Sequence, residues 1–155
     1  MTIPTTISPA APVGSTLSVK PLQGALPRFL DVVDCSPPPT DVVASIDAQP
    51  GSSRNYVNPK STWTTLKILV KGSATFDVSQ IVSAKVGGAS PVTGGWYSVL
   101  SKPWDRNGDG YKDRIYVFRP SETGLTCAST SVTIGGALTS GTAWKGTDTI
   151  KTIYC

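Results

Sequence analysis

The sequence predicts an all-β protein: an antiparallel β-sandwich, Ig-like or jelly-roll-like, that follows an extended N-terminal arm. The first observation is composition, because 15 glycines and 13 prolines in 155 residues, with many serines and threonines, are typical of strands and turns. The second is periodicity, since apolar residues nowhere recur at helical spacing over three turns. The third is length, which suits one domain with an appendage.

The arm is predicted over residues 1–40, which hold eight of the thirteen prolines. Proline lacks an N–H and fixes φ, so this segment cannot pair as a central strand and is expected to be extended, partly as polyproline II. An arm with little core of its own is ordered by contact with something else. We therefore expect it to lie on a neighbouring subunit, the alternative being a disordered tail. The apolar residues available for that contact are Leu17, Val19, Phe29 and Leu30.

The domain is predicted over residues 41–155, where short β-rich runs alternate with turns. The strongest strand is 63–70, in which Leu66, Ile68 and Val70 alternate with Lys67 and Leu69. A hairpin-type turn is predicted at 139–142. Seven or so strands over about 115 residues favour a sandwich with a real core. The other expected strands are 42–47, 81–86, 96–100, 115–118, 131–138 and 150–154.

The segment 105–113 has the spacing of a calcium loop. Oxygen-bearing side chains occupy loop positions 1, 3, 5 and 9, and Gly110 at position 6 permits the sharp bend. Position 12, a bidentate glutamate in an EF-hand, is Tyr116, and the run that follows the loop is β-rich. The sequence thus predicts a Ca²⁺ loop that leads into a strand, the alternative being a metal-free polar turn. The expected ligands are the side chains of Asp105, Asn107, Asp109 and Asp113 and the carbonyl of Tyr111.

Several motifs in this order resemble a calcium-loop β-sandwich module found at the ends of secreted and surface proteins of bacteria and archaea. They include 76–81, the loop 105–113, the run 117–119, 123–125, 146–150 and the terminal Cys155. The resemblance covers 43–155 and implies a calcium-stabilised, non-catalytic domain with the same loop ligands. It also implies a disulfide between Cys127 and Cys155, while the alternative is three reduced, buried thiols.

Composition argues against several classes of function. The chain has no histidine and one glutamate, Glu122, which removes histidine-dependent catalysis and leaves only aspartates for paired carboxylates, so no enzyme is expected. The net charge of +4 is scattered and without a basic run, so no nucleic-acid partner is expected. No stretch approaches the roughly 20 apolar residues that span a bilayer, and no signal peptide is seen at the start.

These observations favour a structural subunit of an extracellular assembly, with a bacteriophage capsid decoration protein on the virion surface as the main hypothesis. Its partners would be neighbouring protein subunits, including copies of itself. One alternative is a secreted or cell-surface module or filament subunit whose arm donates a strand. Another is a calcium-dependent carbohydrate-binding domain, in which the tryptophans form a stacking platform instead of packing in the core and its rim. The tryptophans are Trp63, Trp96, Trp104 and Trp144.

Overall fold

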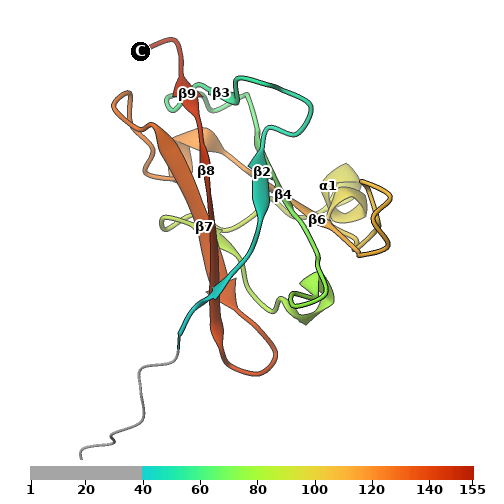
Figure 1. The fold of residues 1–155 in the computed structure, drawn as a ribbon. Helices are drawn as coiled ribbons and strands as arrows, with labels where there is room; N and C mark the ends of the chain where they lie inside the picture. Colours follow the sequence, from blue (N-terminus) through green and yellow to red (C-terminus); the bar gives the residue numbers. More distant parts are fainter. Residues whose placement is uncertain (1–39) are drawn as a thin grey trace, which may run out of the picture. The chain divides into compact units, whose positions relative to one another are not determined.

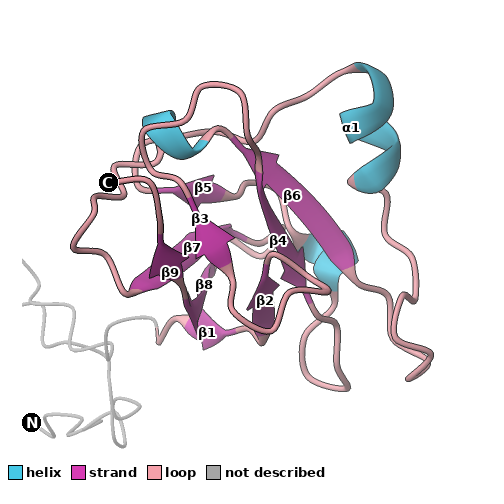
Figure 2. Cartoon of the chain, turned by 90° about the horizontal axis from the view of Figure 1, so that it is seen from above, coloured by secondary structure: helices cyan, strands magenta, loops and turns pink. Residues whose placement is uncertain are grey.

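The protein is described by a computed structural model over residues 40–155. The apolar residues predicted for the assembly arm, Leu17, Val19, Phe29 and Leu30, lie outside the described residues. Within 40–155 the prediction of an all-β fold is confirmed, because short strands form several mainly antiparallel sheets and α1 (Gly95–Leu100) is the one α-helix of this part (Figures 1 and 2).

The larger sheet has four strands in the order β1–β8–β7–β5. Strands β7 (Ser131–Ala137) and β8 (Ala143–Thr149) form an antiparallel hairpin. The Leu138 N–H donates a hydrogen bond of 2.9 Å to the Thr142 carbonyl and closes the turn of this hairpin. The predicted turn at 139–142 is thus confirmed. At the sheet edges, β5 (Lys85–Val86) pairs antiparallel with β7, and β1 (Val42–Val43) pairs parallel with β8.

The second sheet has three antiparallel strands in the order β2–β4–β6, with bounds Ile46–Ala48, Leu66–Val70 and Arg114–Phe118. Side chains alternate between its faces, as strand geometry requires. One face carries Leu66 and Ile68 into the main core, and the other carries Leu69 and Val117 into a smaller cluster. The predicted strand 63–70 therefore exists, but it begins three residues later than expected.

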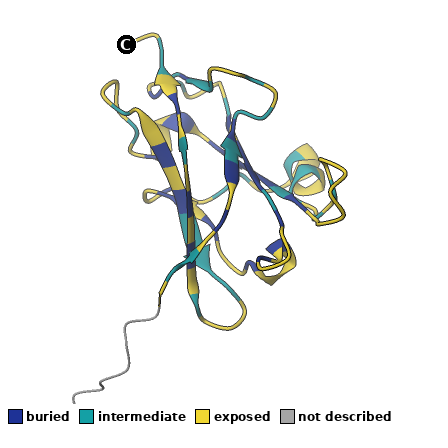
Figure 3. Cartoon of the chain, in the orientation of Figure 1, coloured by how far each residue is buried: buried dark blue, intermediate teal, exposed yellow. Residues whose placement is uncertain are grey.

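Residues from both sheets belong to one buried core. Trp144 of β8 is 1% exposed, and its indole N–H donates to the Ser83 carbonyl at 3.2 Å. Its ring centroid lies 5.7 Å from that of Phe76. Gly146 is required where β2 passes, because a Cβ there would lie 2.5 Å from Cγ2 of Ile46. Figure 3 shows the buried positions of β2, β4 and β6 and the alternation of buried and exposed positions along β7 and β8.

The expected strand over 96–100 is wrong, because these residues form helix α1. Gly94 and Gly95 have positive φ and turn the chain into the helix. Tyr97 and Leu100, three residues apart, then pack against the small cluster on β4 and β6. Figures 1 and 2 show α1 beside β4 and β6, on the side away from β7 and β8.

Strands β8 and β3 were not predicted, and the expected strand 150–154 shrinks to β9 (Lys151–Thr152), which pairs parallel with β3 (Tyr56–Val57). A polar contact holds this region together. Oδ2 of Asp148 accepts the Ala48 N–H at 2.8 Å and the Asn55 side-chain amide at 3.1 Å. One carboxylate thereby connects β8 to β2 and to the residue before β3.

Candidate functional site: the aspartate loop

The aspartate loop, residues 105–113, lies between α1 and β6. Its base is closed by a backbone bridge in which Trp104 and Asp113 exchange two N–H···O=C bonds of 2.9 Å. Strand β6 begins at the next residue, Arg114. The prediction that this loop leads directly into a strand is thus confirmed, and the bridge ties both loop ends to the sheet.

The loop is wound around the carboxylate of Asp105. One oxygen of this side chain accepts the Gly108 N–H at 2.7 Å, and the other accepts the Gly110 N–H at 3.0 Å. Gly108 and Gly110 have φ of 78° and 90°, a region that residues with a Cβ rarely adopt. The two glycines therefore let backbone donors from both bends point back at one aspartate.

Asn107 and Asp109 form the tip of the loop. The Asn107 side-chain oxygen accepts the Asp109 N–H at 3.0 Å, and the Asn107 side-chain amide donates to Asp109 Oδ2 at 2.8 Å. The other Asp109 oxygen accepts the Tyr111 N–H at 2.9 Å. These are local side-chain-to-backbone turns, which explain why the loop is ordered by its own sequence.

Asp113 differs from the other loop acids because it is completely buried. Its two oxygens accept the Gly72 N–H at 3.0 Å and the Arg106 N–H at 3.1 Å. A buried carboxylate needs such donors to offset the loss of hydration. Asp113 therefore anchors the start of the loop to the end of β4.

Gly72 is the part of the site that sequence reasoning missed. It lies 41 residues before Asp113, and a Cβ at Gly72 would stand 2.2 Å from the Lys112 carbonyl oxygen. Only glycine allows the backbone after β4 to approach the loop this closely. No local pattern in the sequence signals this contact, because it depends on the pairing of β4 with β6.

The donor set of the loop suits calcium by its chemistry. Three carboxylates, an amide oxygen and a backbone carbonyl are hard oxygen ligands, and Ca²⁺ takes six to eight of these. In the structure, however, the carboxylates accept loop N–H groups, and within 40–155 no three acidic or cysteine side chains are arranged as a ready metal site. Each carboxylate keeps free lone pairs, since it has roughly four. To coordinate an ion, the loop would have to turn the Asn107 amide away from Asp109.

A pocket of about 280 Å³ lies beside the loop. Asp77 begins the one-turn 3₁₀ helix Val78–Gln80 and accepts both the hydroxyl and the N–H of Ser79, at 2.7 and 2.9 Å. These hydrogen bonds, with a smaller contribution from Lys112, lower the pKa of the Asp77 carboxyl. An ionised carboxylate thus stands next to the loop. The pocket is lined by Ser73, Phe76, Asp77, Ser79, Gly110, Tyr111 and Lys112.

The structure joins Cys127 to Cys155 in a disulfide, with Cα atoms 5.7 Å apart, so this expected pairing is confirmed. The side chain of Thr152 adds a hydrogen bond to the Cys127 carbonyl at 2.9 Å. The bridge and this hydrogen bond tie the residues after β9 to the turn before β7. The alternative of reduced, buried thiols fails for these two cysteines, and Cys35 lies outside the described residues.

The four tryptophans differ in burial. Trp144 alone is in the core, while Trp63, Trp96 and Trp104 are 94, 71 and 70% exposed. Core packing is therefore wrong as an explanation for the other three. Trp104 adjoins the aspartate loop, whereas Trp63 precedes β4 and Trp96 lies in α1.

Comparisons of the chain with protein-family models, with curated proteins and with solved structures found no match. Among the described residues, no helix has the length and apolar character needed to cross a membrane.

Proposed function

We propose that this protein is a non-catalytic structural subunit of an extracellular assembly, whose aspartate loop binds Ca²⁺. The bacteriophage virion surface, with the protein as a capsid decoration, is the assembly that we propose first. The observation that carries the calcium proposal is the winding of the loop around Asp105, with its two glycine bends. This winding folds a nine-residue loop that holds all five candidate oxygen ligands, and hard oxygens of this kind suit Ca²⁺.

The position of the loop supports a bracing role for the ion. Asp113 and the Trp104–Asp113 bridge connect the loop to β6, and the Gly72 N–H connects it to the end of β4. An ion held by Asp105, Asn107, Asp109, Asp113 and the Tyr111 carbonyl would therefore tie together two adjacent strands. Binding to the folded state alone stabilises it, by about 2.7 kcal/mol at a hundredfold excess over Kd.

We also propose that the four-stranded and three-stranded sheets are the two layers of a β-sandwich. Support comes from the single core to which both sheets contribute, with Trp144 and Ile134 from one sheet and Ile68 and Phe118 from the other. Such a body, in which a disulfide ties Cys155 to Cys127, suits a subunit that must keep its shape in an assembly.

The disulfide supports a location outside the cytosol, because disulfides persist in oxidising environments. Free Ca²⁺ is also abundant there, at the concentrations that weak extracellular sites require. We propose that the ion and the disulfide harden the subunit after it leaves the cell. If purified particles kept both their stability and this subunit after chelation and reduction, the hardening would be refuted.

A secreted or cell-surface module, or a filament subunit, is the second candidate. The observation that favours it is the position of β1 at the edge of the four-stranded sheet, where Val43 is 74% exposed. An exposed strand edge accepts a further strand from another chain. Detection of the protein in phage particles, or instead on the cell surface, separates the two candidates.

The calcium proposal is tested by titrating the full chain with CaCl₂ and following heat release and thermal unfolding. We expect saturable binding with Kd at or below about 1 mM, a raised Tm, and a weaker response to MgCl₂. Asp109→Asn removes a loop charge but keeps an oxygen for the Tyr111 N–H, so it should weaken binding at least tenfold. Its control, Asp41→Asn, removes a charge that pairs with Lys145 at 3.0 Å outside the loop.

The result for the control variant decides the location of the site. An equal loss of Ca²⁺ affinity in both variants would show that binding depends on net charge and not on the loop. Failure of millimolar Ca²⁺ to change either the heat signal or the Tm of the unchanged chain would refute the calcium site.

The assembly role of residues 1–40 is tested separately, by light scattering of the full chain with and without Leu17→Asp and Phe29→Asp. If the apolar residues of this segment grip a neighbouring subunit, the charged variants remain single chains, because burial of an unpaired carboxylate is costly. Unchanged assembly in the doubly substituted chain would contradict the role of this segment.

A further inference from the structure

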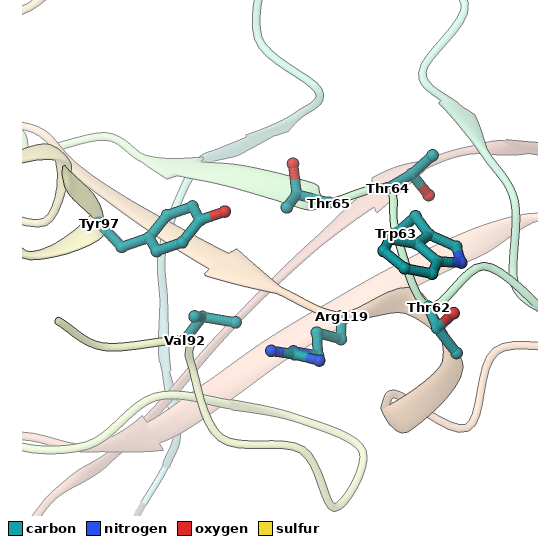
Figure 4. Close-up of a pocket in the computed structure, with 7 residues that line it drawn as sticks. All are labelled: Thr62, Trp63, Thr64, Thr65, Val92, Tyr97 and Arg119. Carbon is teal, nitrogen blue, oxygen red and sulfur yellow. The ribbon is translucent and has the colours of Figure 1, made fainter. Parts of the chain in front are cut away.

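A second pocket lies on the side of the three-stranded sheet that carries α1. It has a volume of about 360 Å³, at the lower end of the range of small-molecule sites of about 300–1,000 Å³. Figure 4 shows the rings of Tyr97 and Trp63 at its two ends, with Arg119 and Val92 between them. The full lining is Thr62, Trp63, Thr64, Thr65, Val92, Tyr97 and Arg119.

Trp63, an aromatic residue of this pocket, does not pack in the core. Trp63 is 94% exposed, whereas tryptophan is highly buried on average. Its flat face carries the negative part of the ring quadrupole. That face attracts polarised C–H groups, such as those on the apolar face of a pyranose ring.

The polar groups of the pocket are also unused by the fold. Within residues 40–155, no hydrogen bond is made by the hydroxyls of Thr62, Thr64, Thr65 and Tyr97 or by the indole N–H of Trp63. The exposed Arg119 side chain likewise makes neither a hydrogen bond nor an ion pair in this part of the chain. No carboxylate lines the pocket. Donors and acceptors for several ligand hydroxyls, and one cation for an acid, are therefore available.

The backbone of the pocket walls is nevertheless held in place. Ser61 Oγ accepts the N–H groups of Trp63 and Thr64, at 3.2 and 2.8 Å. On the opposite wall, Val92 donates its N–H to the Val117 carbonyl at 2.7 Å, and Tyr97 packs on the small cluster of the sheet. A fixed backbone reduces the conformational entropy that is lost when a ligand binds.

We propose that this pocket binds an acidic saccharide. Trp63 would stack on the sugar ring, the threonine hydroxyls would bond its hydroxyl groups, and Arg119 would pair with its carboxylate in the two-pronged manner that guanidinium favours. A nucleic acid fits less well, because only one cation lines the pocket and phosphate binding needs several. The proposal is independent of calcium, since none of the lining residues belongs to the aspartate loop.

The test is calorimetric titration of the full chain, in EDTA, with two acidic probes: tetragalacturonate and a hyaluronan tetrasaccharide. Fully methyl-esterified tetragalacturonate is the matched uncharged probe. We expect at least one acidic probe to bind. If tetragalacturonate binds, its ester should bind at least tenfold more weakly. EDTA excludes bridging by calcium at the aspartate loop.

Two pairs of variants locate the site. Trp63→Ala should weaken the binding of that probe at least tenfold, while Trp96→Ala, which removes an exposed tryptophan outside the pocket, should leave it unchanged. Arg119→Gln should weaken the binding of the acidic probe by a similar factor and abolish any preference for the acid over its ester. Its control, Lys151→Gln, should change neither the affinity nor the preference. The proposal is overturned if neither acidic probe binds, if the ester binds as well as the acid, or if the control variants lose as much affinity as the pocket variants.

Discussion

The two faces of the three-stranded sheet bury very different amounts of apolar side chain. The inner face places Leu66, Ile68 and Phe118 at 0% exposure in the main core. The outer face has only a small cluster, Leu69, Ile115 and Val117, which α1 covers through two half-buried side chains. The same strands therefore carry the main core on one face and a smaller buried cluster on the other.

We expect the inner face to determine the stability of the fold and the outer face to carry the binding pocket. The inner face belongs to the core that residues of both sheets share, so a change there removes many contacts at once. The outer face is covered by a six-residue helix, and beside that helix lies the pocket of Trp63 and Arg119. The pocket therefore lies on the face that carries the smaller cluster, away from the main core.

The largest effect is expected from Ile68→Ala, on the inner face of the central strand. The change leaves a cavity in a core that cannot easily collapse, so it should lower the free energy of unfolding by about 3–4 kcal/mol. Leu69→Ala, one residue away on the outer face, is its matched partner and should cost about 1–2 kcal/mol, because solvent and α1 can adjust. Denaturant unfolding measures both, and equal costs would show that the outer face is packed as tightly as the inner one.

A smaller effect of opposite sign is expected from Tyr116→Phe, also on the inner face. The buried Tyr116 hydroxyl has no hydrogen-bond partner among the described residues. Its removal should therefore leave the free energy of unfolding unchanged or raise it by up to about 1 kcal/mol. A clear loss of stability in denaturant unfolding would mean that the hydroxyl has a partner in solution.

The same variant has a signature at high pH. Burial raises the pKa of Tyr116 from 10.0 to about 12, although the nearby Arg114 acts in the opposite direction. Tyrosine in the unfolded chain loses its proton first, so stability should fall as pH rises from about 10 to about 12. Tyr116→Phe should lack that part of the decline, whereas Tyr154→Phe, at a side chain 81% exposed, should retain it. Identical pH profiles for the two variants would contradict the raised pKa.

The smallest effect on stability is expected from Trp63→Ala, on the outer side of the sheet. Its indole is almost fully exposed, so the free energy of unfolding should change by less than about 0.5 kcal/mol. Chemical unfolding of the free chain measures this. A larger loss would mean that Trp63 supports the fold, and the affinity test of the pocket would then need the milder Trp63→Phe.

Local chemistry made parts of this protein predictable. The alternation in β4, the turn at 139–142 and the bends of the aspartate loop each depend on residues within a few positions of one another. Strand β8 was missed because only two of its positions are buried, Trp144 and Gly146, and one of these has no side chain. Gly146 is buried because Ile46 of β2 lies against it, and no local pattern in the sequence reports that contact.

The candidate sites divide in the same way. The aspartates and glycines of the loop were found from their spacing, but the anchoring of Asp113 by Gly72 was not. The pocket was missed as a whole, because its lining comes from three separate segments, represented by Trp63, Tyr97 and Arg119. The tryptophan platform was an alternative from composition alone, and it could not separate the buried Trp144 from the exposed Trp63.

By itself the sequence determined the all-β class and the aspartate loop, because strand alternation and loop spacing are encoded in adjacent residues. Only the tertiary structure decided that residues 95–100 form a helix, which tryptophan is buried, and where a pocket opens. The physical reason is that burial depends on what packs against a residue, and here the packing partners are distant in the chain.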